Sequence, residues 1–299
     1  MSEPMSVGWI GTGVMGAAMA GHLLAAGHEL TVFNRTKSRA DELVSAGAGW
    51  SDSPQELAAA VDVVITMLGY PTDVRGVLLG EDGVLAAARS GSLIIDMTTS
   101  EPSLANEIHA AAADRDLQAL DAPVSGGDVG ARDASLVIMV GGEPDAFARA
   151  QPLLETLGRS VVLEGGAGAG QHAKMVNQIA IASGMVGMCE AMLYAQRAGL
   201  DVERVIDTIK DGAAGSWSLS NYAPRLLNGD LEPGFKIDHF VKDLGIALTE
   251  ARRLQLPIAG TALAEQLYVA SQAAGLGQKG TQALLATLAR AADARWPPG

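Results

Sequence analysis

Lys174 and Asn177 are the residues whose types and spacing most directly suggest chemistry. They lie three apart at the start of a proline-free run, residues 171–197, which follows a glycine-rich lead-in at 165–170. Residues three apart on a helix share a face. Burial lowers the pKa of a lysine toward the range useful for proton transfer, so Lys174 is a candidate general acid and base. A first-turn lysine that reaches solvent is the alternative.

The run 171–197 predicts one long, largely buried helix that ends before Gly199. Small residues recur on one side of it and would allow another backbone to approach closely, at Ala173, Ala180, Gly184, Gly187, Ala191 and Ala195. A membrane span needs about 20 uninterrupted apolar residues. Lys174, Gln178 and Glu190 interrupt this run, so we expect a core helix and no membrane partner.

A strand at 6–10 leads into a glycine turn and then into a helix at 17–26. Gly11 permits the tight turn, Gly13 lets a pyrophosphate approach the backbone, and Gly16 allows close helix packing. The helix N-terminus supplies amide donors for the phosphates. The placement directly after an N-terminal strand predicts a dinucleotide site.

The second strand, 29–33, ends at Asn34, Arg35, Thr36 and Lys37, where chains that bind NAD usually carry an acidic residue for the adenosine ribose. An arginine, a hydroxyl and a second cation suit a 2'-phosphate instead. We therefore expect NADP, with NAD possible. A solvated turn with incidental charges is the alternative.

Strand and helix patterns alternate up to about residue 166, and only helical patterns follow. Strands are predicted at 61–67, 92–96, 117–121, 136–141 and 160–163, and helices beyond the long one at 202–210, 220–227, 238–254, 260–274 and 281–294. The fold class is α/β: a Rossmann-type doubly wound sheet in residues 1–166, then an all-α domain in 167–299 that serves the substrate and oligomerisation. The long helix lies at the junction.

Strand ends supply further candidates, because ligands bind at the carboxyl edge of such sheets. Met67, Leu68, Thr98 and Thr99 are expected beside the cofactor, with ordinary caps and loop packing as the alternative. The stretch Ser125, Gly126 and Gly127 offers a hydroxyl and open N–H groups that could hold a carboxylate, or simply a tight turn. Lys242, next to Asp243, either forms an ion pair or reaches the cofactor, and Trp217 either lines a pocket or packs in the core.

Composition narrows the class of partner and the compartment. The chain has 299 residues, 48% hydrophobic, with a formal net charge of −13. That charge argues against nucleic acid and anionic membrane surfaces. The lone cysteine, Cys189, excludes an intrachain disulfide and is expected buried and inert, and no metal site is expected. The first residues show no basic stretch before an apolar run, so we expect a cytoplasmic protein.

Four ordered motifs resemble the beta-hydroxyacid dehydrogenase family, relatives of 6-phosphogluconate dehydrogenase. They are GTGVMGAAMA at 11–20, DAPVSGG at 121–127, GAGQHAKMVNQ at 168–178 and KDLGIAL at 242–248. The resemblance implies an enzyme that interconverts short hydroxyacids and their semialdehydes or oxoacids with NAD or NADP. It also implies a homodimer or homotetramer.

The resemblance assigns roles to residues of this chain. Lys174 matches the catalytic lysine, and Asn177 its partner that binds substrate. The substrate-carboxylate loop corresponds to Ser125, Gly126 and Gly127. The cofactor positions correspond to Gly11, Gly13, Val14, Met15, Gly16, Asn34, Arg35, Thr36 and Lys242, with Met67, Leu68 and Thr99 beside them. Lys174 would protonate the alkoxide during reduction and deprotonate the hydroxyl during oxidation.

Departures from the family pattern keep the substrate open. His22 stands where relatives often have asparagine, and residues 133–136 and 275–280 also differ from the common versions. Candidate substrates are 3-hydroxyisobutyrate, tartronate semialdehyde, glyoxylate and succinic semialdehyde types. An imine reductase-like NADPH enzyme and a non-catalytic cofactor-binding protein are the alternatives, and the joint presence of Ser125, Lys174 and Asn177 favours the dehydrogenase.

Overall fold

The chain forms two compact units, Met1–Lys174 and Met175–Gly299. They are seen in a computed structural model that describes residues 4–296. The two units meet inside one continuous helix, α9 (Ala169–Arg197), whereas the predicted domain boundary at residues 166 and 167 lies just before it. The reason for the later division is that the first turn of α9 is bonded to the sheet of the first unit.

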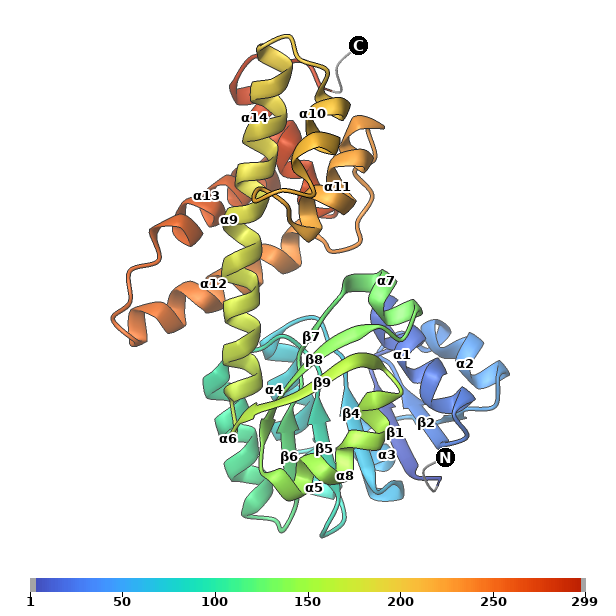
Figure 1. Cartoon of the computed structure of the whole chain (residues 1–299). Coiled ribbons are helices and arrows are strands. Elements are labelled where there is room, and N and C mark those ends of the chain that lie inside the picture. The colour runs from blue at the N-terminus through green and yellow to red at the C-terminus, as the bar shows by residue number, and fades with distance from the viewer. Residues whose placement is uncertain (1–3, 297–299) are drawn as a thin grey trace. The chain divides into compact units, whose positions relative to one another are not determined.

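One sheet organises the first unit (Figure 1). Its strands are β1 (Ser6–Ile10), β2 (Glu29–Phe33), β3 (Gly49–Trp50), β4 (Val63–Thr66), β5 (Leu93–Asp96), β6 (Gln118–Asp121), β7 (Val124–Ser125), β8 (Leu136–Gly142) and β9 (Gly158–Gly165). The order is β3-β2-β1-β4-β5-β6-β8-β7, and β9 pairs with β8. The first six strands are parallel, and β8 turns antiparallel against β6. This order confirms the predicted Rossmann-type sheet.

Helices cover both faces of this sheet. They are α1 (Val14–Ala25), the 3-10 helix η1 (Lys37–Ala40), α2 (Asp41–Ser45), α3 (Pro54–Ala60), α4 (Pro71–Leu79), α5 (Val84–Ala87), α6 (Pro102–Ala113), α7 (Gly127–Arg132) and α8 (Pro144–Glu155). Alternate strand residues enter two separate cores: Trp9 packs with α1 and α8, and Ile10 packs with α3, α4 and α6. The central strands read as unbroken apolar runs because both of their faces are buried.

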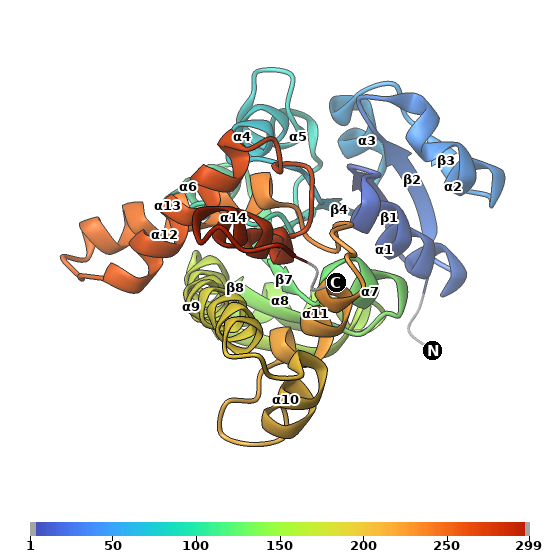
Figure 2. The ribbon, with the colours of Figure 1, turned by 90° about the horizontal axis from the view of Figure 1, so that it is seen from above.

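The second unit is helical within the described residues. After the C-terminal part of α9 come α10 (Val202–Ile209), α11 (Trp217–Leu227), α12 (Ile237–Arg253), α13 (Ala259–Ala273), the 3-10 helix η2 (Thr281–Ala283) and α14 (Leu284–Ala291). Helices α12 and α13 run side by side in both views (Figures 1 and 2). The ring of Phe240 meets the ring of Tyr268 edge-on at 4.9 Å in the core of this unit. Cys189 lies in the same core, where burial raises the pKa of its thiol to about 12.

Helix α9 is buried on one side only. Met185, Met188 and Met192 enter the core of the second unit. On the small-residue side, the exposed positions are Ala180, Gly184, Gly187 and Ala191, whereas Ala195 is buried. At Gly184 and Gly187 a Cβ would meet no atom within 4 Å, so none of the described residues 4–296 approaches closely at these two positions. By length and composition alone α9 could cross a membrane, a test that core helices of water-soluble proteins also pass. Lys174, Gln178 and Glu190 therefore do not by themselves exclude a membrane span.

Candidate active site

The glycine turn between β1 and α1 has the local geometry that its sequence predicts. Gly11 has a φ of +102°, and a Cβ there would clash with the carbonyl oxygen of Met67. A Cβ on Gly16 would clash with the carbonyl oxygen of Gly11. Gly13 is different, because a Cβ there would meet nothing within 4 Å. Gly13 is also the N-cap residue of α1 and makes no side-chain cap, and first-turn N–H groups of a helix without such a cap can bind an anion.

Two neighbouring residues of the loop after β2, Asn34 and Arg35, make different contacts. The Asn34 side chain accepts the N–H of Thr12 at 3.1 Å and donates to the carbonyl oxygen of Thr36 at 2.8 Å. It therefore ties the loop to the glycine turn. The Arg35 side chain is 89% exposed and lies 3.6 Å from the Asp73 carboxylate, so its guanidinium is placed for a ligand in solution. Sequence reasoning gave both residues one role, and the structure separates them.

The ends of β4 and β5 are joined by a buried carboxylate. Asp96 accepts hydrogen bonds from the Thr66 hydroxyl at 2.7 Å and from the N–H of Thr98 at 3.1 Å, both on the same oxygen. The Thr98 hydroxyl in turn accepts the N–H of Leu68 at 2.8 Å. Burial raises the pKa of Asp96 to about 6, although these hydrogen bonds oppose the rise. This network holds the predicted cofactor neighbours Met67, Leu68 and Thr99 on adjacent strand ends.

The predicted carboxylate loop lies where β7 passes into α7. Gly126 and Gly127 have φ values of +133° and +64°, so both positions need glycine. Ser125 pairs with Val137 of β8, which fixes the start of the loop. His22 of α1, one of the departures from the family pattern, lies with its Nε2 3.0 Å from the carbonyl oxygens of Ala131 and Arg132 and so closes the end of α7.

Lys174 reaches this loop from the first turns of α9. Its side chain is buried, with the residue 6% exposed, and its Nζ donates to the carbonyl oxygen of Val124 at 2.8 Å. The solvent-reaching alternative is therefore wrong. Val124, which accepts this hydrogen bond, directly precedes Ser125 in the chain. The structure therefore brings together Lys174 and the loop from Ser125 to Gly127.

Two further residues of the site were not predicted from the sequence. Asp121, at the end of β6, accepts the N–H of Gly168 at 2.8 Å on one carboxylate oxygen and the N–H of Gln171 at 2.7 Å on the other. The Gln171 side chain accepts the N–H of Ser100 at 2.9 Å and donates to the carbonyl oxygen of Thr98 at 2.7 Å. Both residues lie inside the family-like motifs, and that was the only available signal.

In the second unit, Asn177 and Lys242 belong to one chain of polar contacts. Asn177 donates to Gln178 at 2.8 Å, and Gln178 donates to Asp243 at 2.6 Å. The Nζ of Lys242 lies 2.9 Å from the other oxygen of Asp243, whose side chain is 1% exposed. The ion pair, one of the two alternatives for Lys242, is therefore present, and a cofactor-binding role for Lys242 stays a prediction.

Trp217 is 60% exposed and meets Tyr222 edge-on at 5.2 Å, so it is not a core residue. A pocket-lining role for Trp217 stays a prediction.

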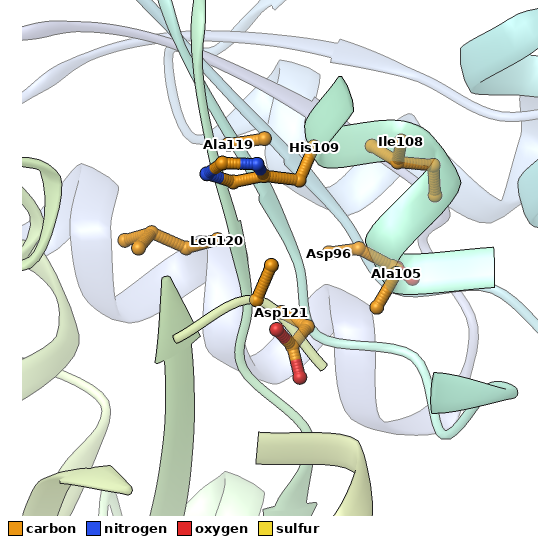
Figure 3. Close-up of a pocket in the computed structure, with 8 residues that line it drawn as sticks. Asp96, Ala105, Ile108, His109, Ala119, Leu120 and Asp121 are labelled. Carbon is orange, nitrogen blue, oxygen red and sulfur yellow. The ribbon is translucent and has the colours of Figure 1, made fainter. Parts of the chain in front are cut away.

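A small cavity opens between α6 and the strands β5 and β6 (Figure 3). It measures about 10 Å³, room for about one water and too little for a hydroxyacid. Asp96, Asp121 and His109 line it. Over residues 4–296, no three histidine, cysteine, aspartate or glutamate side chains gather closely enough to hold a metal ion.

Comparison with known proteins identifies the class. The family model described as the NAD binding domain of 6-phosphogluconate dehydrogenase matches residues 6–166. The model described as NAD-binding of NADP-dependent 3-hydroxyisobutyrate dehydrogenase matches residues 168–288. Fold and site thus define an oxidoreductase that binds NAD or NADP.

Individual relatives cover nearly the whole chain. An uncharacterized oxidoreductase of Bacillus subtilis is 51% identical over 93% of this chain and 97% of its own length. A probable mitochondrial 3-hydroxyisobutyrate dehydrogenase-like protein of Arabidopsis thaliana is 51% identical over 95% of this chain and 85% of its own length. The solved structure of Mycobacterium tuberculosis 3-hydroxyisobutyrate dehydrogenase with L-serine is 33% identical, with a TM-score of 0.87 over 95% of this chain and 99% of that one. The chain belongs to the beta-hydroxyacid dehydrogenase family.

Proposed function

We propose that this protein catalyses reversible hydride transfer between NADP(H) and a short beta-hydroxyacid or its semialdehyde, with Lys174 as the general acid and base. One observation carries the proposal: a buried lysine amine is held 2.8 Å from the Val124 carbonyl oxygen, directly beside the loop from Ser125 to Gly127. Burying an ammonium is costly. A buried lysine beside an open glycine loop at the carboxyl edge of a dinucleotide-binding sheet is suited to proton transfer.

The residues of the first unit fit a dinucleotide. The space over Gly13 is empty of protein atoms, and the uncapped start of α1 presents N–H groups for a pyrophosphate. Val14, at the first position of that helix, is 75% exposed, and Met15 follows it. Arg35 and Thr36 would hold the adenosine ribose and its 2'-phosphate. When bound, the nicotinamide supplies or accepts the hydride.

Proton transfer and substrate orientation fall to different residues of the chain. In reduction, the Nζ of Lys174 donates a proton to the oxygen that develops negative charge, and in oxidation the neutral amine removes the hydroxyl proton. The Ser125 hydroxyl and the N–H groups of Gly126 and Gly127 hold the substrate carboxylate. Asn177 binds the substrate on the same helix as Lys174, with its amide oriented by Gln178.

Among the candidate substrates we place first the short beta-hydroxyacids that carry a hydroxymethyl group on the carbon that bears the carboxylate. The relatives support this choice, because 3-hydroxyisobutyrate and L-serine, which appear in their names, both have this arrangement. The chemistry of the site agrees, since it offers one loop for a carboxylate and one amine for the hydroxyl. Tartronate semialdehyde, glyoxylate and succinic semialdehyde types stay in the substrate panel.

For NADP over NAD, the support is the exposed guanidinium of Arg35 and the lack of an acidic residue between Asn34 and Lys37. For assembly, we propose a homodimer or homotetramer through the exposed small-residue side of α9, where Val176 and Tyr194 are 67% and 75% exposed. For the compartment, we propose the cytoplasm. The buried, unreactive Cys189 is compatible with that choice.

The test is a substrate panel on the purified protein, assayed with NADPH and NADH, followed by a variant pair. Lys174→Met keeps the volume but removes the amine, and we expect it to lower kcat on the order of 100- to 10,000-fold. Lys210→Ala, a surface lysine paired with Asp207, is the matched control and should keep the wild-type rate. A Lys174→Met enzyme at full rate would remove this function. Cofactor binding without turnover of any acid would favour the imine reductase-like or non-catalytic alternative.

A further inference from the structure

The start of α9 is fastened to the end of β6 by a single carboxylate. Both oxygens of Asp121 are used, one by the N–H of Gly168 and one by the N–H of Gln171. The first N–H groups of a helix have no partner within it, so a carboxylate there both caps the helix and complements its dipole. Asp121 is 5% exposed, which keeps water from replacing it. The position of the first turn of α9 therefore depends on the end of β6.

Gln171 fastens the same turn to a second strand end. Its side-chain amide bridges the Thr98 carbonyl oxygen and the Ser100 N–H, both just after β5. Gln171 is completely buried. A buried side-chain amide that both accepts and donates a hydrogen bond restricts the position and the rotation of its own residue, because both bonds must form at the same time.

Lys174 adds a second contact between α9 and the chain that follows β6. Val124 lies three residues after Asp121, and its carbonyl oxygen accepts the Lys174 amine. Gln171, whose N–H binds Asp121, lies one helical turn before Lys174. A short strand end thus holds α9 at two points. The fit is tight as well, since a Cβ on Gly170 would come within 2.7 Å of the Asp121 carbonyl oxygen.

We propose that Asp121 and Gln171 are positioning residues that fix the amine of Lys174 against the substrate loop. They touch neither substrate nor cofactor in this proposal, and they act through Lys174 alone. The inference rests on the proposed function of Lys174. It goes beyond that function by stating what determines where the lysine stands.

The first variant is Asp121→Asn, which keeps the shape but turns an NH2 group toward one of the two backbone N–H groups. One hydrogen bond is lost and two donors face each other, so the first turn of α9 must shift. A misplacement of about 1 Å can cost on the order of 100-fold in rate. We expect kcat to fall roughly 10- to 100-fold, with the Kd for NADPH changed less than about 2-fold because the glycine turn is untouched.

The matched control is Ser53→Ala. The Ser53 hydroxyl caps α3 in the same unit by accepting the N–H of Glu56 at 3.0 Å, so its loss lowers stability by the same kind of cap removal. It lies on a helix that does not carry Lys174. We expect Ser53→Ala to lower Tm while kcat stays at the wild-type value.

The decisive readout is a double-mutant cycle of Asp121→Asn with Lys174→Met, followed by single-turnover NADPH oxidation at high enzyme concentration. If Asp121 acts only through the lysine, Asp121→Asn will slow the Lys174→Met enzyme less than about 2-fold. A slowing as large as in the wild-type background would overturn the proposal, as would an Asp121→Asn enzyme with full kcat.

If Asp121→Asn does not fold, Gln171→Met is the variant that tests the proposal. It preserves volume and removes both amide hydrogen bonds, and we expect a kcat roughly 10-fold lower with the same lack of additivity. Full activity in Lys174→Met alone would instead remove the proposed function, and that result is seen in the single variant before the cycle is built.

Discussion

The glycine turn and the start of α9 lie at the carboxyl edge of one sheet, but they are built in opposite ways. At the glycine turn the protein leaves space: nothing lies within 4 Å of a Cβ on Gly13, and the Arg35 side chain is 89% exposed. At the start of α9 the protein fills space, with Asp121, Gln171 and Lys174 all buried and bonded to the chain itself.

The difference matches the roles that we propose for the two regions, cofactor binding at the glycine turn and proton transfer at Lys174. A cofactor brings its own charges, so its site needs open N–H groups and an accessible cation. A proton-transfer group must already stand in its reactive position, because any search for that position adds to the barrier. Binding thus depends on groups left open to a ligand, and catalysis depends on groups already bonded within the protein.

At the cofactor site, the largest effect should come from two glycine-to-alanine changes three residues apart. Gly13→Ala adds a methyl group in open space, so we expect an unchanged Tm and an NADPH affinity lower on the order of 100-fold, about 3 kcal/mol. Gly16→Ala forces a Cβ into the Gly11 carbonyl, so we expect a loss of roughly 3 kcal/mol in the free energy of unfolding. Thermal unfolding and cofactor titration separate the two effects. A Gly13→Ala protein with a lower Tm than wild type would contradict the contrast between open space at Gly13 and filled space at Gly16.

A smaller effect is expected at the ribose end. Arg35→Ala should weaken NADPH binding roughly 10- to 100-fold, because a charge-assisted hydrogen bond contributes about 1.5–3 kcal/mol. NADH binding should not change. Arg89→Ala is the control, since Arg89 is also an exposed arginine in an ion pair of the first unit, with Asp62 at 3.0 Å. Equal losses for the two cofactors in Arg35→Ala would contradict the predicted NADP preference.

The fold was predictable where short-range patterns suffice. Apolar runs and the glycine turn placed the main strands, and the family-like motifs predicted a Rossmann-type sheet, which the structure confirms. Helix α4 was not predictable in this way, because it begins at Pro71 after a Gly-Tyr pair that resembles a loop. The strands β3 and β7 have two residues each, too few to show an alternating pattern. Helix α7 was not predicted either, because residues 126–130 contain three glycines and glycine usually marks a turn.

The candidate site was predictable by residue type but not by contact. Lys174 and the loop from Ser125 to Gly127 were predicted as separate motifs, and only the fold shows that the amine reaches the Val124 carbonyl oxygen. Asp121 and Gln171 bond across 50 residues of sequence. No local pattern specifies such a partner, because a buried aspartate at a strand end has many possible donors within reach.

The smallest expected effect compares the two buried carboxylates at the ends of β5 and β6. Asp96 accepts the Thr66 hydroxyl and the Thr98 N–H on one oxygen, and the amide oxygen of Asp96→Asn can replace that oxygen. Burial raises the pKa of Asp96 to about 6 from 3.8, so the ionised group opposes folding above that range. Wild-type stability should therefore fall as pH rises from about 4 to about 6. Asp96→Asn should be more stable than wild type by about 1–3 kcal/mol at pH 8.

Thermal unfolding at pH 8 and pH 4 checks the sign of this effect. The gain from Asp96→Asn should vanish near pH 4, where the carboxyl is protonated in the folded and in the unfolded chain alike. Burial raises the pKa of Asp121 as well, but both of its oxygens accept backbone N–H groups and an amide can serve only one. We therefore expect Asp121→Asn to be less stable than wild type at pH 8, opposite in sign to Asp96→Asn. An Asp121→Asn protein as stable as wild type at pH 8 would contradict the role of Asp121 at the start of α9. Opposite signs would show that the two backbone hydrogen bonds of Asp121 outweigh the cost of its burial and hold the helix that carries Lys174.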